Sequence, residues 1–426
     1  MHTRPLPPDV DASAPAVAVP SSDLPARCDV LVVGAGPAGC AVATLLARAG
    51  REVVLVDAQA FPRDKTCGDG LIPDAHAALA RLGVLEAVMA RAHRVEAVRC
   101  VGPSGNSIDL PGELAVLPRR VLDELLCRHA IAAGARFVAP MRFEKPILND
   151  GVATTADVSP RVVGAWLRQG ERSFEIRADW VILATGAALV PLTAVDLCQR
   201  RSPSGIALRG YVHNPAMAAQ IRSMDVVWHR SLRPGYGWVF PVGGDVFNIG
   251  VGILPGRGKP MPEVNLRSVL DAFTHCYAPA QALMAGGTLV GDFKGAPLRC
   301  SLDGAGHSRT GLLAVGEAIG STYAFTGEGI GKAMETGIHA AEAILAGASD
   351  AEVRADYDAR LARLKPRFDL YERANRVNAQ PWLTDLVIWR ARRSPRLHRR
   401  MAGLLNETSN PGNLFSLKGW LRFFTE

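Results

Sequence analysis

The sequence predicts an α/β protein in which a domain with a parallel sheet, assembled from discontinuous segments, is interrupted by an inserted, mostly antiparallel sheet and followed by a carboxyl-terminal helical region. Three observations predict this class. An apolar run at 29–33 leads into glycines with G-x-G-x-x-G spacing and then into a helix of small residues. Short strands separated by turn residues are indicated at 94–116 and 191–289. A second glycine-rich segment follows another buried strand at 312–315, so the first domain is expected to be built from discontinuous segments.

The amino-terminal glycines have the context that a dinucleotide-binding turn requires. The strand before them is rich in β-branched residues, as a strand buried on both faces should be. Gly34 permits the tight turn, Gly36 lets the backbone approach a pyrophosphate, and Gly39 lets helix and strand pack closely. Ala38 lies at the helix N-terminus, whose free N–H groups attract phosphate. Asp57 ends the next strand, eighteen residues after Gly39 (57 minus 39), where a ribose-binding carboxylate is expected. This segment therefore predicts a Rossmann-type nucleotide domain.

The other elements follow from apolar runs and from the residues that end them. Gly50 and Gly134 are placed to end helices, and the Pro-Ser-Gly-Asn turn at 103–106 indicates a hairpin. The expected elements are helices at 40–49, 73–82, 117–133 and 330–345, strands at 136–139 and 179–184, a hairpin across 95–110, and mostly β-structure across 205–252.

At 426 residues the chain is too long for one ordinary core, so we expect two domains and an appended region. We assign 27–93, 117–190 and 290–346 to the nucleotide-binding domain, 94–116 and 191–289 to the inserted substrate domain, and 347–426 to a carboxyl-terminal helical region. Residues 1–26 are rich in proline, alanine and serine and are expected to form a disordered tail.

Composition narrows the class of protein. The tail has no basic start and apolar core of a signal peptide, and no apolar run reaches the roughly 18 residues that cross a bilayer. The eight cysteines have no C-x-x-C spacing, as expected for buried thiols in a reducing compartment. We therefore expect a cytoplasmic protein without a metal site.

Four segments between 29 and about 340 together resemble the geranylgeranyl reductase family, within the flavoproteins that share the fold of aromatic hydroxylases. They are the glycine fingerprint, the loop KTCGDGL at 65–71, the segment PGYGWVFP at 234–241, and the glycine-rich segment at 316–330. The Cys-Gly loop combined with Tyr-x-Trp-x-Phe-Pro is more specific than a dinucleotide fingerprint.

The resemblance implies an FAD-dependent oxidoreductase that uses electrons from NAD(P)H to reduce C=C bonds in a prenyl-type lipid or a quinone tail. Tyr236, Trp238 and Phe240 alternate along a strand, so all three lie on one face, and Pro241 is expected to end that strand. The resemblance places them, with Cys67, at the catalytic pocket; by themselves such stripes are more often ordinary core. Cys67 is a buried spacer, a proton donor or a redox-active thiol, and the sequence leaves its role open.

The resemblance also assigns contacts with the FAD cofactor. Arg119, followed by Asp123 on a helix, matches the fold's Arg-x-x-x-Asp pattern and would reach phosphate or ribose oxygens; a surface arginine is the alternative. The distal segment would approach the flavin ring, with a helix N-terminus directed at it. Its contributing residues are Gly316, Glu317, Gly327, Gly329 and Ile330.

Three positions depart from the pattern of the wider fold. Glu317 stands where an aspartate normally contacts the ribityl chain, and Ala324 replaces a proline before the Phe-Thr-Gly run. The sequence ATGA at 184–187 stands where aromatic hydroxylases usually have Asp-Gly.

The alternative function is an FAD-dependent monooxygenase that hydroxylates an aromatic small molecule or an aromatic side chain of a protein partner. A halogenase is less favoured, since that class carries Trp-x-Trp-x-Ile-Pro; a non-catalytic flavin-binding protein would leave the loop and the aromatic strand unexplained.

The net charge of +7 is unevenly distributed. Arginines crowd the region 382–404 beside tryptophans at 382 and 389. This pattern is typical of a solvated helical face, or of a surface helix that contacts anionic lipid or an acidic partner. No nucleic-acid-binding motif accompanies the arginines, so we expect no nucleic acid partner. The expected ligand is an apolar small molecule or lipid, with peripheral contact at a membrane surface through this region.

Overall fold

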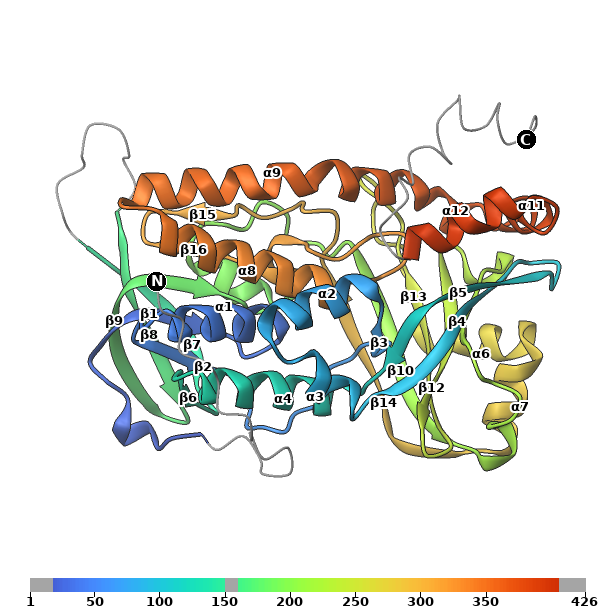
Figure 1. The fold of residues 1–426 in the computed structure, drawn as a ribbon, viewed down its shortest axis with the longest axis horizontal. Helices are drawn as coiled ribbons and strands as arrows, with labels where there is room; N and C mark the ends of the chain where they lie inside the picture. Colours follow the sequence, from blue (N-terminus) through green and yellow to red (C-terminus); the bar gives the residue numbers. More distant parts are fainter. Residues whose placement is uncertain (1–17, 150–159, 406–426) are drawn as a thin grey trace.

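The computed structural model describes residues 18–149 and 160–405, and within them the strands form two eight-stranded sheets (Figure 1). The predictions for residues 1–17 and 406–426 lie outside the described residues. The disordered tail predicted for 1–26 is wrong for its second part. Residues Ser21–Asp23 form a short 3-10 helix, η1, and the Val19 N–H donates to the Phe137 carbonyl at 2.8 Å. This contact attaches the segment to the edge of the first sheet.

The first sheet is the nucleotide-binding sheet, and its central strands are parallel. β1 (Arg27–Val33) pairs on one side with β2 (Val53–Val56) and on the other with β9 (Arg172–Leu183). The order β15-β16-β9-β1-β2-β6 is completed by β6 (Arg136–Val138), β16 (Leu312–Ala314) and β15 (Ser308–Arg309), and β7 (Arg142–Leu148) and β8 (Val162–Gln169) extend β9. Strands from both ends of the chain meet here, as a discontinuous domain requires.

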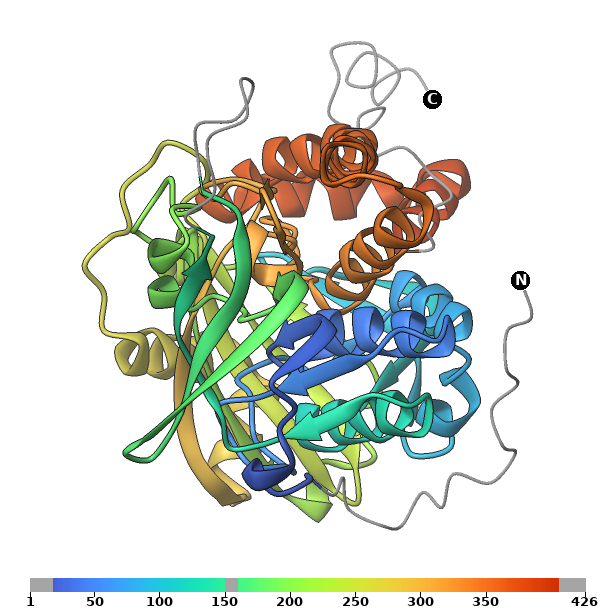
Figure 2. The ribbon, with the colours of Figure 1, turned by 90° about the vertical axis from the view of Figure 1, so that its left-hand side faces the viewer.

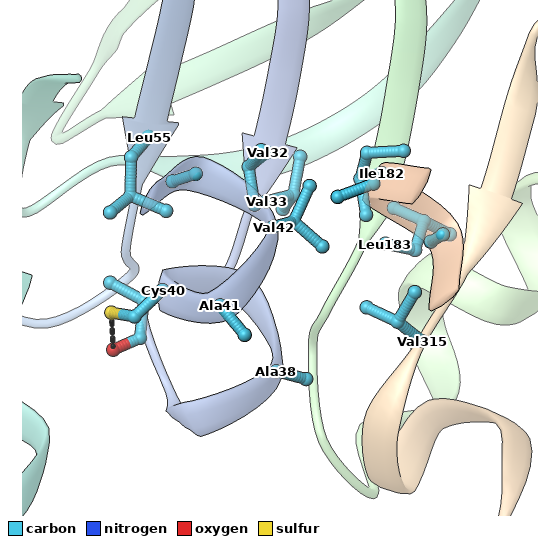
Figure 3. Close-up of a cluster of buried hydrophobic side chains, with 14 of the residues drawn as sticks. Val32, Val33, Ala38, Cys40, Ala41, Val42, Leu55, Ile182, Leu183 and Val315 are labelled. Carbon is cyan, nitrogen blue, oxygen red and sulfur yellow. Dashed lines mark hydrogen bonds between the residues drawn. The ribbon is translucent and has the colours of Figure 1, made fainter. Parts of the chain in front are cut away.

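One helix packs closely against this sheet and a second packs closely on the first, because glycines and alanines line these contacts. α1 (Pro37–Arg48) follows the glycine turn, and α8 (Ile330–Ala346) follows the distal segment. A Cβ at Gly39 would lie 1.8 Å from the Gly34 carbonyl oxygen, and one at Gly337 would lie 2.4 Å from that of Ala38. Figure 3 shows the apolar side chains of α1, β1, β2 and β9 that fill the space between helix and sheet.

The second sheet has the order β14-β10-β13-β12-β11-β4-β5-β3, and β4 and β11 are its one parallel pair among the described residues. Its strands are β3 (Gly70–Leu71), β4 (His93–Val101), β5 (Ser107–Val116), β10 (Gly205–His213), β11 (Met224–Val227), β12 (Gly235–Gly243), β13 (Val246–Ile253) and β14 (Thr288–Leu298). Helices α6 (Leu266–Cys276) and α7 (Ala278–Gly286) pack on one face through a buried cluster that includes Phe273 and Leu283.

Two sequence predictions about this sheet are corrected. The segment 290–346 was assigned to the nucleotide domain, but β14 pairs with β10, so the second sheet continues to Leu298. Pro241 does not end its strand, because β12 continues to Gly243. The register shifts between Pro241 and Gly243, and a β-bulge is one of the places where a sheet tolerates proline.

The carboxyl-terminal region is helical, as predicted, over the residues described. α9 (Asp350–Ala374) lies along the nucleotide domain (Figure 1). Beyond it, α10 (Arg376–Ala379) contacts β12, and α11 (Trp382–Ala391) and α12 (Pro395–Leu405) lie near β4 and β5. In Figure 2 these orange-to-red helices lie together along one side of the molecule. None of the helices in 18–149 and 160–405 combines the length and apolar character needed to span a bilayer.

The helical elements not yet named are four α-helices and three 3-10 turns among the described residues. These are α2 (Pro73–Leu82), α3 (Leu85–Met89), α4 (Arg119–Ala132), α5 (Leu189–Ala194), and the 3-10 turns η2 (Pro215–Met217), η3 (Arg230–Leu232) and η4 (Gly316–Ile319). α4 precedes β6 and α2 contacts α8, so both help to position the two glycine segments.

Candidate active site

A single cavity of about 770 Å³ contacts both sheets and the helices α10 to α12. Most residues that the sequence predicted for the site line this cavity: Gly34, Gly36, Ala38, Asp57, Cys67, Arg119, Tyr236, Trp238, Phe240, Glu317, Gly327, Gly329 and Ile330. Gly39 and Gly316 do not line it. A Cβ at Gly316 would lie 2.7 Å from the Ala38 Cβ, so these two glycines permit close packing beneath the site.

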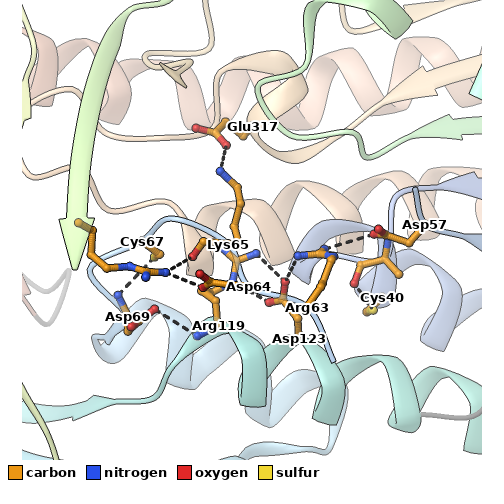
Figure 4. A network of polar contacts seen from close by, with 12 residues as sticks. Cys40, Asp57, Arg63, Asp64, Lys65, Cys67, Asp69, Arg119, Asp123 and Glu317 are labelled. Atoms are coloured by element: carbon orange, nitrogen blue, oxygen red, sulfur yellow. Dashed lines mark hydrogen bonds and ion pairs between the residues drawn. The ribbon is translucent and has the colours of Figure 1, made fainter. Parts of the chain in front are cut away.

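The glycine turn faces two guanidinium groups. A Cβ at Gly36 would lie 3.7 Å from Arg63 Nη2 and 3.8 Å from Arg119 Nη2. Arg119 donates from Nε and Nη2 to both carboxylate oxygens of Asp123, at 2.6 and 2.8 Å (Figure 4). Arg63 also contacts Asp123, at 3.0 Å, and Asp57, at 3.3 Å. The carboxylates of Asp57 and Asp123 hold both guanidinium groups beside the glycine turn. Guanidinium groups in this position suit the binding of a diphosphate.

Arg63 is a site residue that sequence reasoning missed. The available signal was a run of charged residues at 63–65 immediately before the Cys-Gly loop. Asp57, which was predicted, is held by the Ala35 N–H at 2.9 Å and the Gln59 N–H at 3.0 Å. The Asp57 carboxylate therefore also stabilises the glycine turn, because Ala35 lies within that turn.

The second glycine segment contributes polar atoms that have no partner among the described residues. Glu317 Oε1 is buried and accepts no hydrogen bond, while its Oε2 lies 3.9 Å from Lys65 Nζ. The buried hydroxyls of Thr185 and Thr326 also lack partners and line the same cavity. Because buried polar groups are normally hydrogen-bonded, these atoms fit a ligand with hydroxyl and carbonyl groups, as a flavin dinucleotide has.

The glycines at 327 and 329 make room for protein groups of the site. A Cβ at Gly327 would lie 2.5 Å from the Tyr236 hydroxyl, and one at Gly329 would lie 2.7 Å from Thr322 Oγ1. The Tyr236 hydroxyl donates to the Thr326 carbonyl at 2.6 Å. The aromatic strand and the loop before α8 are thus directly joined.

Aromatic side chains of β12 form one wall of the cavity. Tyr236, Trp238 and Phe240 lie in sequence on one face, with ring centroids 6.2 and 6.5 Å apart. The opposite face packs on α6, since a Cβ at Gly237 would lie 2.5 Å from the Phe273 ring. Trp228 adds to the wall and stacks on Phe325 at 5.8 Å.

The Cys-Gly loop lies against this aromatic wall. A Cβ at Gly68 would lie 3.2 Å from the Phe240 ring and 3.6 Å from Trp238 Nε1. Trp238 Nε1 donates to Asn248 Oδ1 at 2.9 Å, and Asn248 Nδ2 donates to the Cys67 carbonyl at 2.8 Å. Burial raises the pKa of the Cys67 thiol. Asn248 carried no sequence signal, because it lies in an ordinary strand far from the motif that it supports.

Beyond the aromatic wall, the cavity becomes apolar. Side chains of β4 and β11 line it on one side, and side chains of α10, α11 and α12 line it on the other. They include Val98, Val226, Val377, Ile388, Met401 and Leu405. The arrangement suits a polar dinucleotide at one end and a hydrocarbon chain at the other.

Comparisons with known proteins agree with this arrangement. The FAD binding domain family matches residues 27–222. The menaquinone reductase of Mycolicibacterium smegmatis is 34% identical over 339 residues, which cover 75% of this chain and 77% of that protein. The digeranylgeranylglycerophospholipid reductase of Methanoculleus marisnigri is 29% identical over 357 residues, covering 78% of this chain and 81% of the relative.

Solved structures share the fold. A geranylgeranyl bacteriochlorophyll reductase-like protein from Thermoplasma acidophilum superposes with a TM-score of 0.69 at 22% identity, covering 94% of this chain and 96% of its own. The likeness extends over both sheets and the carboxyl-terminal helices, and the identity with the menaquinone reductase extends over three quarters of the sequence. The chain therefore belongs to the geranylgeranyl reductase family of FAD-dependent oxidoreductases.

Proposed function

We propose that this protein reduces C=C bonds in the prenyl chain of a lipid or a quinone, with electrons that NAD(P)H delivers to bound FAD. The observation that carries the proposal is the continuity of the cavity. One end has the arginines and the glycine turn, the other end is apolar, and Cys67 with the aromatic wall lies between them. Two relatives support it by name: one is a menaquinone reductase, and the other is a digeranylgeranylglycerophospholipid reductase.

The residues have distinct roles in this reaction. Arg63, Arg119 and the α1 N-terminus would bind the diphosphate of FAD, and Glu317 would accept a hydrogen bond from its ribityl chain. FAD, when bound and reduced, supplies a hydride. An isolated alkene has no carbonyl to polarise, so the protein's task is to hold the chain in place and exclude water. Tyr236, Trp238 and Phe240 do this through their rings.

Cys67 is the proton donor in this proposal. Saturation of one C=C bond requires a hydride on one carbon and a proton on the other. The Cys67 S–H bond breaks as the second C–H bond forms, and the thiolate regains its proton from solvent before the next turnover. The thiol lines the cavity where the polar and apolar ends meet, which is the position that this step needs.

The partner that supplies the substrate is a membrane surface. α11 and α12 line the apolar end of the cavity with one face and carry exposed tryptophans and arginines on the other. A prenyl chain resides in a bilayer, and tryptophan with arginine is the combination that suits its interface. We therefore propose that the region 382–404 contacts lipid and that the chain enters the cavity beside it.

The test uses the FAD-loaded protein without oxygen. NADPH or NADH is added first, and loss of the oxidised flavin absorbance reports reduction. A prenylated quinone in mixed micelles is then added, and mass spectrometry of the quinone is expected to show addition of two hydrogens per bond, with return of the flavin absorbance. The Cys67→Ala variant should still be reduced by the nucleotide but should lose most of the second step.

The opposite result would support the alternative function. If prenyl substrates leave the reduced flavin unchanged and oxygen instead yields a hydroxylated aromatic compound or protein side chain, the protein is a monooxygenase and the proposal fails. Flavin reduction by a different donor, with normal prenyl reduction, would overturn only the assignment of NAD(P)H.

A further inference from the structure

Two cations that line the cavity also act on Cys67. Arg119 and Lys65 lie close enough to favour the charged form of its sulfur, and Arg119 is the first residue of α4, whose N-terminus adds partial positive charge. A thiolate cannot donate a proton to an alkene. Burial of the sulfur opposes these cations, and a nearby negative charge would oppose them further.

Asp69 provides such a charge from inside the protein. Its side chain is fully buried, with 0% of the residue exposed. Its Oδ1 accepts a hydrogen bond from the Arg119 backbone N–H at 3.1 Å. Its Oδ2 accepts hydrogen bonds from Asn248 Nδ2 at 2.8 Å and from the Tyr211 hydroxyl. Three donors on two oxygens favour the ionised carboxylate and offset part of the cost of burying its charge.

The same residue fixes the position of the sulfur. The Asp69 N–H donates to Cys67 Sγ at 3.3 Å, and Asp69 has a φ of 65°, a left-handed conformation that is uncommon for a residue other than glycine. Asn248 Nδ2 contacts both the Cys67 carbonyl and the Asp69 carboxylate. The side-chain bonds of Asp69 therefore hold the backbone that points its N–H at the thiol.

We propose that Asp69 is a positioning residue that fixes the Cys67 loop against the aromatic wall and keeps Cys67 in its thiol form, opposing Arg119 and Lys65. The inference rests on the proposed function only in taking Cys67 as the proton donor.

The charges around Cys67 act in the directions that this role requires. Burial raises the pKa of the thiol most, and the Asp69 carboxylate raises it further, whereas Arg119, the hydrogen bond from the Asp69 N–H, and Lys65 lower it. Burial also raises the pKa of Asp69 to about 6, against the opposing effects of Tyr211, Arg209, Asn248 and Arg119. Asp69 is therefore charged above about pH 6, where it favours the thiol, and becomes neutral below that pH.

The test observes the thiol directly. The infrared S–H stretching band of Cys67 is isolated as the difference between the FAD-loaded protein and its Cys67→Ser variant, and it is followed as the pH rises. In Asp69→Asn this band is expected to disappear at a pH at least one unit lower than in the unaltered protein. The control, Asp64→Asn, removes a carboxylate from the same loop that pairs with Arg209 and Lys294, and should leave the midpoint unchanged. An unchanged midpoint in Asp69→Asn would overturn the proposal.

A second measurement needs no Asp69 variant. In the unaltered protein, the frequency of the Cys67 S–H band should shift as Asp69 loses its charge, with a midpoint near pH 6. A frequency that stays constant through this range would show that the sulfur does not sense the carboxylate. Neither readout involves substrate, so failure of prenyl reduction with both expected band shifts would overturn the proposed function and leave the role of Asp69 intact.

Discussion

Gly36 and Gly39 belong to one motif but meet different surroundings. At Gly39 a side chain would overlap the Gly34 carbonyl oxygen, at 1.8 Å, so this glycine is required by the contact between α1 and the turn that follows β1. At Gly36 the nearest atoms to an added Cβ are guanidinium nitrogens at 3.7 and 3.8 Å, which is ordinary contact distance. The space above Gly36 is therefore free for a ligand and is not filled by the fold itself.

This difference predicts separate effects for two similar substitutions. Gly36→Val should fold with nearly unchanged thermal stability without FAD but should lose most of its flavin on gel filtration, because the side chain occupies the place of the diphosphate. Gly39→Val should lower stability whether or not flavin is present. Flavin absorbance per protein and thermal unfolding of the flavin-free forms measure the two effects. Normal flavin retention by Gly36→Val would contradict the assignment of the site.

At the scale of elements, α10 joins the aromatic wall to the loop before α8. Asn378, which is fully buried, accepts the Trp228 indole N–H at 2.7 Å and donates to the Phe325 carbonyl at 3.2 Å. It also donates to Asn375 Oδ1 at 2.6 Å. A short helix thus fixes two segments of the site that are distant in sequence, and its two asparagines gave no local signal of this role.

Asn378→Ala is therefore expected to lower the free energy of unfolding by about 2–4 kcal/mol, because it leaves the buried groups that Asn378 contacts without partners. It should also weaken FAD binding, since the loop at 322–329 loses a support. The control is Gln220→Ala, at an exposed position whose amide makes only a 3.4 Å contact with the Ala216 carbonyl. Chemical denaturation compares the two; equal, small effects would show that α10 does not hold the site together.

These elements also show what the sequence could and could not predict. The glycine turn, the helix at 73–82 and the aromatic face of β12 depend on residues close in sequence, and their patterns were sufficient. The contact between Asp69 and Asn248 joins positions 179 residues apart, and it depends on how the second sheet lies against the Cys-Gly loop. The boundary at 290 was wrong for a related reason, since pairing with β10, and not local composition, decides which sheet β14 joins.

At the scale of the whole molecule, the cavity and the outer surface meet at the same two helices. Ile388 of α11 and Met401 of α12 line the cavity, whereas Trp382 and Trp389 are 58% and 47% exposed. The two tryptophans are seven residues apart, so they lie on one face of α11. The Arg393 guanidinium lies 4.5 Å above the Trp389 ring. This face combines the apolar and cationic groups that an anionic lipid surface attracts.

Binding to vesicles tests this face. Arg396, Arg399 and Arg400 of α12 are exposed, and their combined change to glutamate should weaken binding to vesicles containing phosphatidylglycerol by more than about tenfold, because each arginine near such a surface contributes about 1 kcal/mol. The same change at Arg51, Arg120 and Arg172 alters net charge equally at exposed positions elsewhere in the protein and should have little effect.

The tryptophans predict a separate, salt-resistant component. Trp382→Ala with Trp389→Ala should reduce the binding that remains at high salt, where the attraction of the arginines is screened. Both sets of variants should still reduce a short prenyl substrate dispersed in detergent, because none of the altered side chains lines the cavity. Flotation of vesicles with and without phosphatidylglycerol distinguishes the two contributions. If the α12 variant and the control with equal charge bind alike, net charge and not this face drives attachment, and the prenyl chain must reach the cavity by another route.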